Sequence, residues 1–145
     1  MKFLKHPLHV MLIHFPSALL PADLVLSYLF YRTGTESFGS AAFYCLVGGV
    51  ILGWLSGITG LIDLVLIKDK NTMAAALIHG GINLTVVLVF SVFAYKSWNL
   101  YPQIQTPTIV ILIVKLITII FMLIGNYLGG RLIFKHHIAI ENEKI

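Results

Sequence analysis

Histidines are the residues of this 145-residue sequence whose type and spacing best suit chemistry. The six of them lie at or near the ends of long apolar segments: His6, His9, His14, His79, His136 and His137. Imidazole ligates haem iron, zinc, copper and non-haem iron, and it can also relay protons. Ionisable side chains in or near a membrane are costly and usually functional. We therefore expect the functional site in this histidine layer.

Composition indicates what must position these histidines. The chain is 58% hydrophobic and 11% charged, with a mean hydropathy of +0.91, whereas a soluble domain carries about a quarter charged residues. A membrane-spanning helix needs roughly 20 apolar residues, and four segments qualify: Leu8–Tyr31, Ala41–Ile67, Met73–Trp98 and Thr108–Phe134. Lipid offers the backbone no hydrogen-bond partners, so the segments should be helices. The sequence predicts an all-α, transmembrane four-helix bundle that forms one domain over residues 1–145.

Lysine and arginine counts predict the orientation of the bundle. With four spans, the two termini and the middle link share one side of the membrane. That side carries Lys2, Lys5, Lys68, Lys70, Arg131, Lys135 and Lys144, against Arg32 and Lys96 on the other. The positive-inside rule then places both termini in the cytoplasm, in a bacterial inner membrane. The net charge of +4 is explained by topology and requires no nucleic-acid partner.

Polar residues of different helices should meet in the cytoplasmic half. At about 1.5 Å per residue, His14 and His79 each lie roughly 9 Å inside the boundary, and Asp63 lies at a similar depth. Asn83 follows His79 by one helical turn on the same face. Asn126 lies deeper on the fourth helix. We expect Asp63, Asn83 and Asn126 to orient imidazoles by hydrogen bonds.

Two charged residues should meet in the other half. Asp23 on the first helix and Lys115 on the fourth each lie roughly 10–12 Å from the opposite boundary. A pair would reduce the cost of burying each charge in the membrane. We expect a structural ion pair that makes these helices neighbours; a proton or ion relay is the functional alternative.

A stripe of glycines marks one face of the second helix: Gly49, Gly53, Gly57 and Gly60. Small residues four apart let membrane helices approach closely. The stripe predicts helix packing, with a homo-oligomer through Gly49, Gly53 and Gly57 as one form of it. The same smooth groove could instead admit a flat macrocycle.

The histidines fit haem or another metal. Haem in a helical bundle takes ligands from facing helices, which favours His14 and His79 as axial ligands, with His9 and His136 as substitutes. A transition-metal site built from His6, His9, His14, His79 and His136 with Asp63 is the alternative. Zinc is less favoured, because paired histidines at i and i+4 are absent. Covalent haem attachment is excluded, because the sequence has no Cys-x-x-Cys-His.

The opening run His6-Pro7-Leu8-His9, continued as His14-Phe15-Pro16, resembles the signature of the membrane family called domain of unknown function 2231. Gly60–Asp63, His79 and the closing run from Gly129 to His136 are similar to further motifs of that family. Val10 replaces the family's usual second proline, and His137 stands where glycine is usual. Some members are associated with Rieske or c-type cytochrome modules, so the resemblance implies a redox context.

These observations favour a b-type haem protein in electron transfer, with the haem near the cytoplasmic side and a quinone or another redox protein as partner. One alternative is a metal-binding or proton-conducting bundle that uses the same histidines. Another is a structural subunit that docks through its glycine stripe. No nucleophile–base pair or phosphate-binding loop is evident, so an electron carrier or binding protein is favoured over a stand-alone enzyme.

Overall fold

The computed structural model describes residues 2–3 and 6–136, with side chains from residue 8 to residue 132. The elements follow in the order β1 (Lys2–Phe3), β2 (His6–Pro7), α1 (Leu8–Leu12), α2 (His14–Thr33), α3 (Glu36–Val65), α4 (Lys70–Leu100) and α5 (Ile109–His136). The two short strands pair antiparallel, Lys2 opposite Pro7. His137 lies outside the described residues, as do the side chains of His6 and His136.

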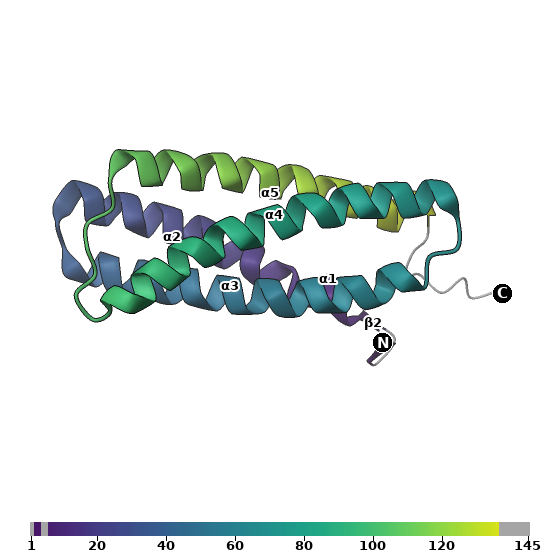
Figure 1. The fold of residues 1–145 in the computed structure, drawn as a ribbon, viewed down its shortest axis with the longest axis horizontal. Helices are drawn as coiled ribbons and strands as arrows, with labels where there is room; N and C mark the ends of the chain where they lie inside the picture. The colour runs from purple at the N-terminus through teal and green to yellow at the C-terminus, as the bar shows by residue number, and fades with distance from the viewer. Residues whose placement is uncertain (1, 4–5, 137–145) are drawn as a thin grey trace.

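The long helices confirm the predicted fold class. The spans Leu8–Thr33, Glu36–Val65, Lys70–Leu100 and Ile109–Leu132 are each long and apolar enough to cross a membrane. They lie alongside one another in an elongated bundle, and α2 begins at the same end at which α3 and α5 finish (Figure 1). Many large apolar side chains point outward, for example Val65, which is 77% exposed, and Leu61, which is 62% exposed. Lipid is the environment that suits such a surface.

The helices extend beyond the predicted apolar segments. The second helix begins at Glu36 rather than Ala41, and the third begins at Lys70 rather than Met73. At both starts the helix continues over polar residues, because local sequence rather than hydrophobicity decides where a helix begins. The Asp69 carboxylate caps α4 by accepting from the Thr72 amide at 2.7 Å. Gly34, with φ of +67°, ends α2 in the left-handed conformation.

The first span is interrupted near the membrane boundary. α1 ends at Leu12 and α2 begins at His14, although Ile13 keeps helical dihedral angles. Pro16 lacks the amide hydrogen that would bond the Leu12 carbonyl, which is the physical reason for an irregularity here. The short helix α1 contacts α3.

An apolar core fills the middle of the bundle. Its buried members come from α2, α3, α4 and α5: Leu20, Leu46, Val50, Val86, Phe90, Ile119 and Met122. Phe90 is 0% exposed and Leu20 is 1% exposed. The apolar layer separates the histidine end of the bundle from the end that carries Asp23 and Lys115.

Candidate functional site

His9 is held against the backbone of α3. Its Nδ1 lies 2.8 Å from the carbonyl oxygen of Ser56. A carbonyl can only accept, so Nδ1 carries the hydrogen and donates it. The Ser56 hydroxyl oxygen lies 3.3 Å from the same nitrogen and accepts a weaker share of that hydrogen. The interaction fixes both the tautomer and the direction of the ring.

His79 is held in the same way against α5. Its Nδ1 lies 2.8 Å from the Gly125 carbonyl oxygen and therefore donates to it. The Asn83 Nδ2 lies 3.1 Å from that nitrogen, but an amide nitrogen and a protonated Nδ1 are both donors. The geometry is better explained by the bond from Asn83 Nδ2 to the His79 carbonyl at 3.0 Å. Asn83 thus packs beside His79, one turn away, as the spacing predicted.

Both rings therefore keep a lone pair on Nε2. The rings are neighbours, with centroids 6.3 Å apart and planes inclined at 81°. A histidine that ligates a metal typically donates its other ring N–H to a carbonyl or carboxylate, which is the arrangement of both rings here. Two residues 70 positions apart in the sequence are brought together with the same tautomer.

Glycines provide the space for the two imidazoles. A Cβ added at Gly60 would lie 2.8 Å from His9 Cε1, and one at Gly129 would lie 2.6 Å from His79 Cε1. Real Cβ atoms essentially never approach so closely. Gly60 and Gly129 are therefore required by ring placement. A Cβ at Gly130, the next residue, would meet nothing within 4 Å.

The other predicted ligands lie elsewhere or outside the description. His14 is exposed on α2, and the ring beside His79 is that of His9. The pairing of His14 with His79 that the sequence favoured is thus not the one found. His9 lies on α1 and contacts α3 through the Ser56 carbonyl. The side chains of His6 and His136 are not described.

The remaining predicted polar residues take different positions. Asn126 Nδ2 donates to the Ser17 hydroxyl at 2.9 Å, while its buried Oδ1 has no hydrogen-bond partner among the described residues. Asp63 is half-buried on α3, three residues after Gly60. Asn83 is a predicted orienting group that the structure places against a histidine.

The glycine stripe of α3 is used inside the chain. A Cβ at Gly49 would lie 2.7 Å from Leu20 Cδ2, and one at Gly53 would lie 3.1 Å from Val87 Cγ2. Both glycines are buried by α2 and α4, so they are not available to a second copy, contrary to the predicted oligomer contact. Gly57 is exposed. The prediction that the glycine stripe serves helix packing is therefore confirmed for Gly49 and Gly53.

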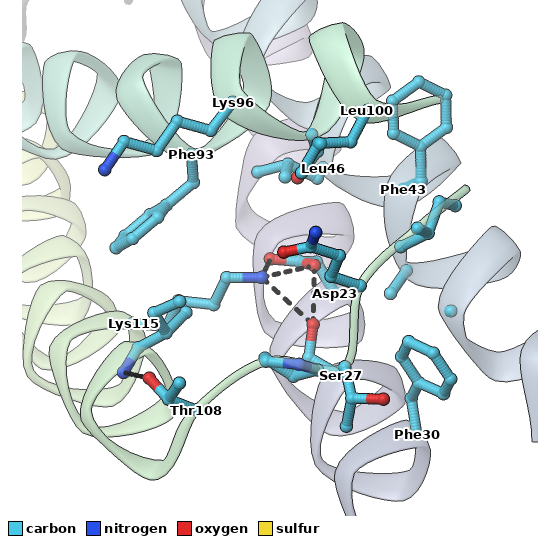
Figure 2. A pocket seen from close by; sticks show the side chains of 18 residues that line it. Asp23, Ser27, Phe30, Phe43, Leu46, Phe93, Lys96, Leu100, Thr108 and Lys115 are labelled. Atoms are coloured by element: carbon cyan, nitrogen blue, oxygen red, sulfur yellow. Dashed lines mark hydrogen bonds and ion pairs between the residues drawn. The ribbon is translucent and has the colours of Figure 1, made fainter. Parts of the chain in front are cut away.

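A second polar group lies on the other side of the apolar core. Lys115 Nζ lies 2.8 Å from Asp23 Oδ1 and 2.7 Å from Oδ2. It also donates to the Ser27 hydroxyl at 3.0 Å, and that hydroxyl donates to Asp23 Oδ1 at 3.1 Å. Figure 2 shows the three side chains joined between α2 and α5. The ion pair expected from depth alone is present, and it makes these two helices neighbours.

Serines were missed by the sequence reasoning at both sites. Ser27 lies one turn after Asp23, so i to i+4 spacing is a signal that could have found it. Ser56 contributes mainly its backbone carbonyl, and Gly125 contributes only its carbonyl. Backbone acceptors leave no residue-type signal, so the partners of both histidines were invisible in the sequence.

The donor set around the histidines is small. Within residues 8–132, whose side chains are described, no three His, Cys, Asp or Glu side chains gather closely enough to hold a metal ion. Among the described side chains, the candidate site presents a pair of neighbouring imidazoles.

Comparison with known proteins supports the resemblance seen in the motifs. The model of a family described as predicted membrane protein, domain of unknown function 2231, matches residues 5–142. Searches of curated proteins and of solved structures gave no match. The match spans nearly the whole chain, including both histidines of the pair and all four membrane-spanning helices. The protein is an integral membrane protein and belongs to the domain of unknown function 2231 family.

Proposed function

We propose that this protein binds a b-type haem between His9 and His79 and transfers electrons in the membrane. One observation carries the proposal: two neighbouring imidazoles each donate Nδ1–H to a backbone carbonyl at 2.8 Å, which leaves each Nε2 available as a ligand. His9 replaces the exposed His14 as the partner of His79 in this assignment.

The separation of the rings supports a shared metal ion. Two imidazoles that bind one ion from opposite sides, each nitrogen about 2 Å from the metal, have centroids about 6 Å apart. The observed centroid distance is 6.3 Å. An edge-to-face contact between uncoordinated rings falls in the same range, and the visible spectrum distinguishes the two.

The number of ligands favours haem over a bare metal ion. A structural zinc site needs four ligands, and catalytic zinc needs three from the protein. Haem iron takes four nitrogens from its own macrocycle and needs at most two from the protein. The pair of histidines in the described chain matches that requirement. Bare backbone at Gly57 and Gly80, where an added Cβ would meet nothing within 4 Å, is compatible with a flat macrocycle nearby.

The residues around the pair would hold and tune the group. Bound haem supplies a reversible one-electron change at iron. The Ser56 and Gly125 carbonyls keep the two imidazoles in the required tautomer and increase their basicity. Asn83 steadies the turn of α4 that carries His79. Haem at this end lies on the cytoplasmic side if the charge asymmetry sets the orientation as expected.

The apolar core argues against a proton-conducting bundle. A relay across the membrane requires polar groups or water at successive depths. The layer around Phe90, Leu20 and Leu46 is buried and apolar, and it separates the histidines from Lys115 and Asp23. Electron transfer needs no such polar path.

The test is the visible spectrum of protein purified after expression with haem supplied, recorded oxidised and then reduced with dithionite. A Soret band that shifts on reduction, with sharp α and β bands, is the expected signature of iron with two histidine ligands. A protein that remains colourless would overturn the proposal, and metal analysis would then test the alternative of a bare ion.

A further inference from the structure

The Ser56 carbonyl that holds His9 receives a second side-chain donor, from its own helix. Thr59 Oγ1 lies 2.8 Å from the Ser56 oxygen, the same distance at which the His9 Nδ1 lies. The contact of Thr59 Oγ1 with the Leu55 carbonyl is longer, 3.2 Å, so the hydroxyl hydrogen is directed mainly to Ser56. The imidazole and the hydroxyl therefore share one acceptor.

Thr59 differs in this respect from other hydroxyls of the helices. Thr85 and Thr118 donate to the carbonyl four residues earlier, at 2.9 Å and 2.7 Å, which is a usual arrangement of threonine within a helix. Thr59 forms its shorter contact with the carbonyl three residues earlier. That carbonyl is the one bonded to His9, so Thr59 is linked to the histidine pair.

Sharing an acceptor weakens both bonds. A backbone carbonyl has two lone pairs, and within an α-helix it ordinarily accepts the amide four residues later. His9 and Thr59 then compete for the charge that remains on the Ser56 oxygen. A hydrogen bond from a ligand imidazole to an acceptor increases the basicity of that imidazole. The Thr59 hydroxyl therefore limits this increase for His9.

The carbonyl that holds His79 has no hydroxyl at the equivalent positions of its own helix. The Gly125 oxygen accepts from His79 Nδ1 at the same distance, 2.8 Å. The residues three and four positions later are Leu128 and Gly129, which carry no hydroxyl. The two imidazoles are thus bonded at equal distance to acceptors of unequal strength.

We propose that Thr59 is a positioning residue that acts through the Ser56 carbonyl on His9, and that its hydroxyl raises the reduction potential of the bound haem. A more basic ligand stabilises ferric iron, and hydrogen bonds to the ligands are one means by which a protein sets the potential. By limiting the basicity of His9, Thr59 favours the ferrous state. The effect on the potential rests on the haem function proposed above, whereas the shared carbonyl does not depend on it.

Redox titration of the haem-loaded full chain in detergent tests the effect on the potential. Thr59→Val keeps the shape of the side chain and removes the hydroxyl, so its potential should be lower. At a fixed solution potential, the ratio of ferric to ferrous haem should increase about twofold or more, which corresponds to part of one hydrogen bond. Thr59→Ala removes the same hydroxyl and should lower the potential too. An unchanged or higher potential in either folded variant would overturn the proposal.

Two matched controls separate the hydroxyl from other effects of substitution. Thr85→Val removes a hydroxyl that donates to Gly81 within α4 and should leave the potential unchanged. Thr59→Ser retains the hydroxyl and should retain the potential. An equal decrease in Thr85→Val, or in Thr59→Ser, would show that loss of the bond to Ser56 is not the cause.

Proton–nitrogen NMR of the haem-free full chain in micelles tests the shared carbonyl itself. The Nδ1–H resonance of His9, assigned by its loss in His9→Gln, should move downfield in Thr59→Val, because its hydrogen bond becomes stronger. It should not move in Thr85→Val. A resonance that stays in place in Thr59→Val would overturn the proposal even in a protein that binds haem. The expected movement in a protein that remains colourless would support the shared carbonyl and remove the haem, so the two failures are distinguishable.

Discussion

The imidazoles of His9 and His79 lie edge to face, 6.3 Å between centroids, and each is bonded through Nδ1 to a helix other than its own. Because α1 is fastened to α3 and α4 to α5, the pair joins four elements at one end of the bundle. The predictions about the site follow from this relationship.

Removal of either ring should abolish the spectrum of haem with two histidine ligands. His9→Ala and His79→Ala should each lose it while still inserting into the membrane, because the apolar spans are unchanged. His14→Ala is the control: its side chain is exposed, and its spectrum should match that of the unmodified protein. If His9→Ala kept a normal spectrum, or if His14→Ala lost it, the second ligand beside His79 would be His14. Absorption spectra of the purified variants provide the measurement.

A substitution at Gly129, which the His79 ring contacts, tests whether the position of that ring matters. Gly129→Ala would place a Cβ 2.6 Å from His79 Cε1, and the rigid ring must move off its carbonyl partner. Displacement of such a supporting bond should weaken haem affinity about 10–100-fold. Gly130→Ala meets nothing within 4 Å and should leave affinity unchanged. Haem titration followed by Soret absorbance compares the two, and equal affinities would show that ring position is not set by this contact.

The buried ion pair should respond unequally to single and double changes. Asp23→Leu or Lys115→Met leaves one unpaired charge in the interior and should cost about 3–5 kcal/mol of unfolding free energy. The double variant removes both charges and should be considerably more stable than either single variant. Denaturation in mixed micelles measures all three. Additive losses in the double variant would mean that the charges act independently.

Orientation can be tested by cysteine labelling. In a Cys45→Ala background, Thr35→Cys lies in the α2–α3 link and Asn71→Cys lies in the first turn of α4, at opposite ends of the bundle. The positive-inside rule predicts that a membrane-impermeant maleimide labels position 35 but not position 71 in intact cells. The reverse pattern would place the histidine pair on the outer side.

The fold could be predicted from the sequence because a strong signal, the long apolar segment, occurs four times. About 20 apolar residues in succession admit few structures in lipid, so the four spans are predictable. The start of α4 is not, because the Asp69 cap extends this helix beyond its apolar run. Depth arithmetic also anticipated the meeting of Asp23 and Lys115, since helix rise is constant.

The site could be predicted less well from the sequence, for a physical reason. Depth along the bundle does not specify which way a side chain faces, and His9 and His14 are both near the same end. The groups that hold His9 and His79 are the backbone carbonyls of Ser56 and Gly125. Residue types give no signal of a backbone carbonyl, so the sequence could predict the histidine layer but not the pair.

Because each imidazole is bonded to a helix other than its own, the geometry of the pair depends on correct assembly of the bundle. A slide of α4 and α5 past α1 and α3 by one helical turn, about 5.4 Å, is nearly as long as the 6.3 Å between the rings and would separate them. The two Nε2 atoms can therefore act together only after all four spans have inserted and found their final register. In a partly inserted chain the ligands exist, but the site does not, so cofactor capture would mark the completion of folding.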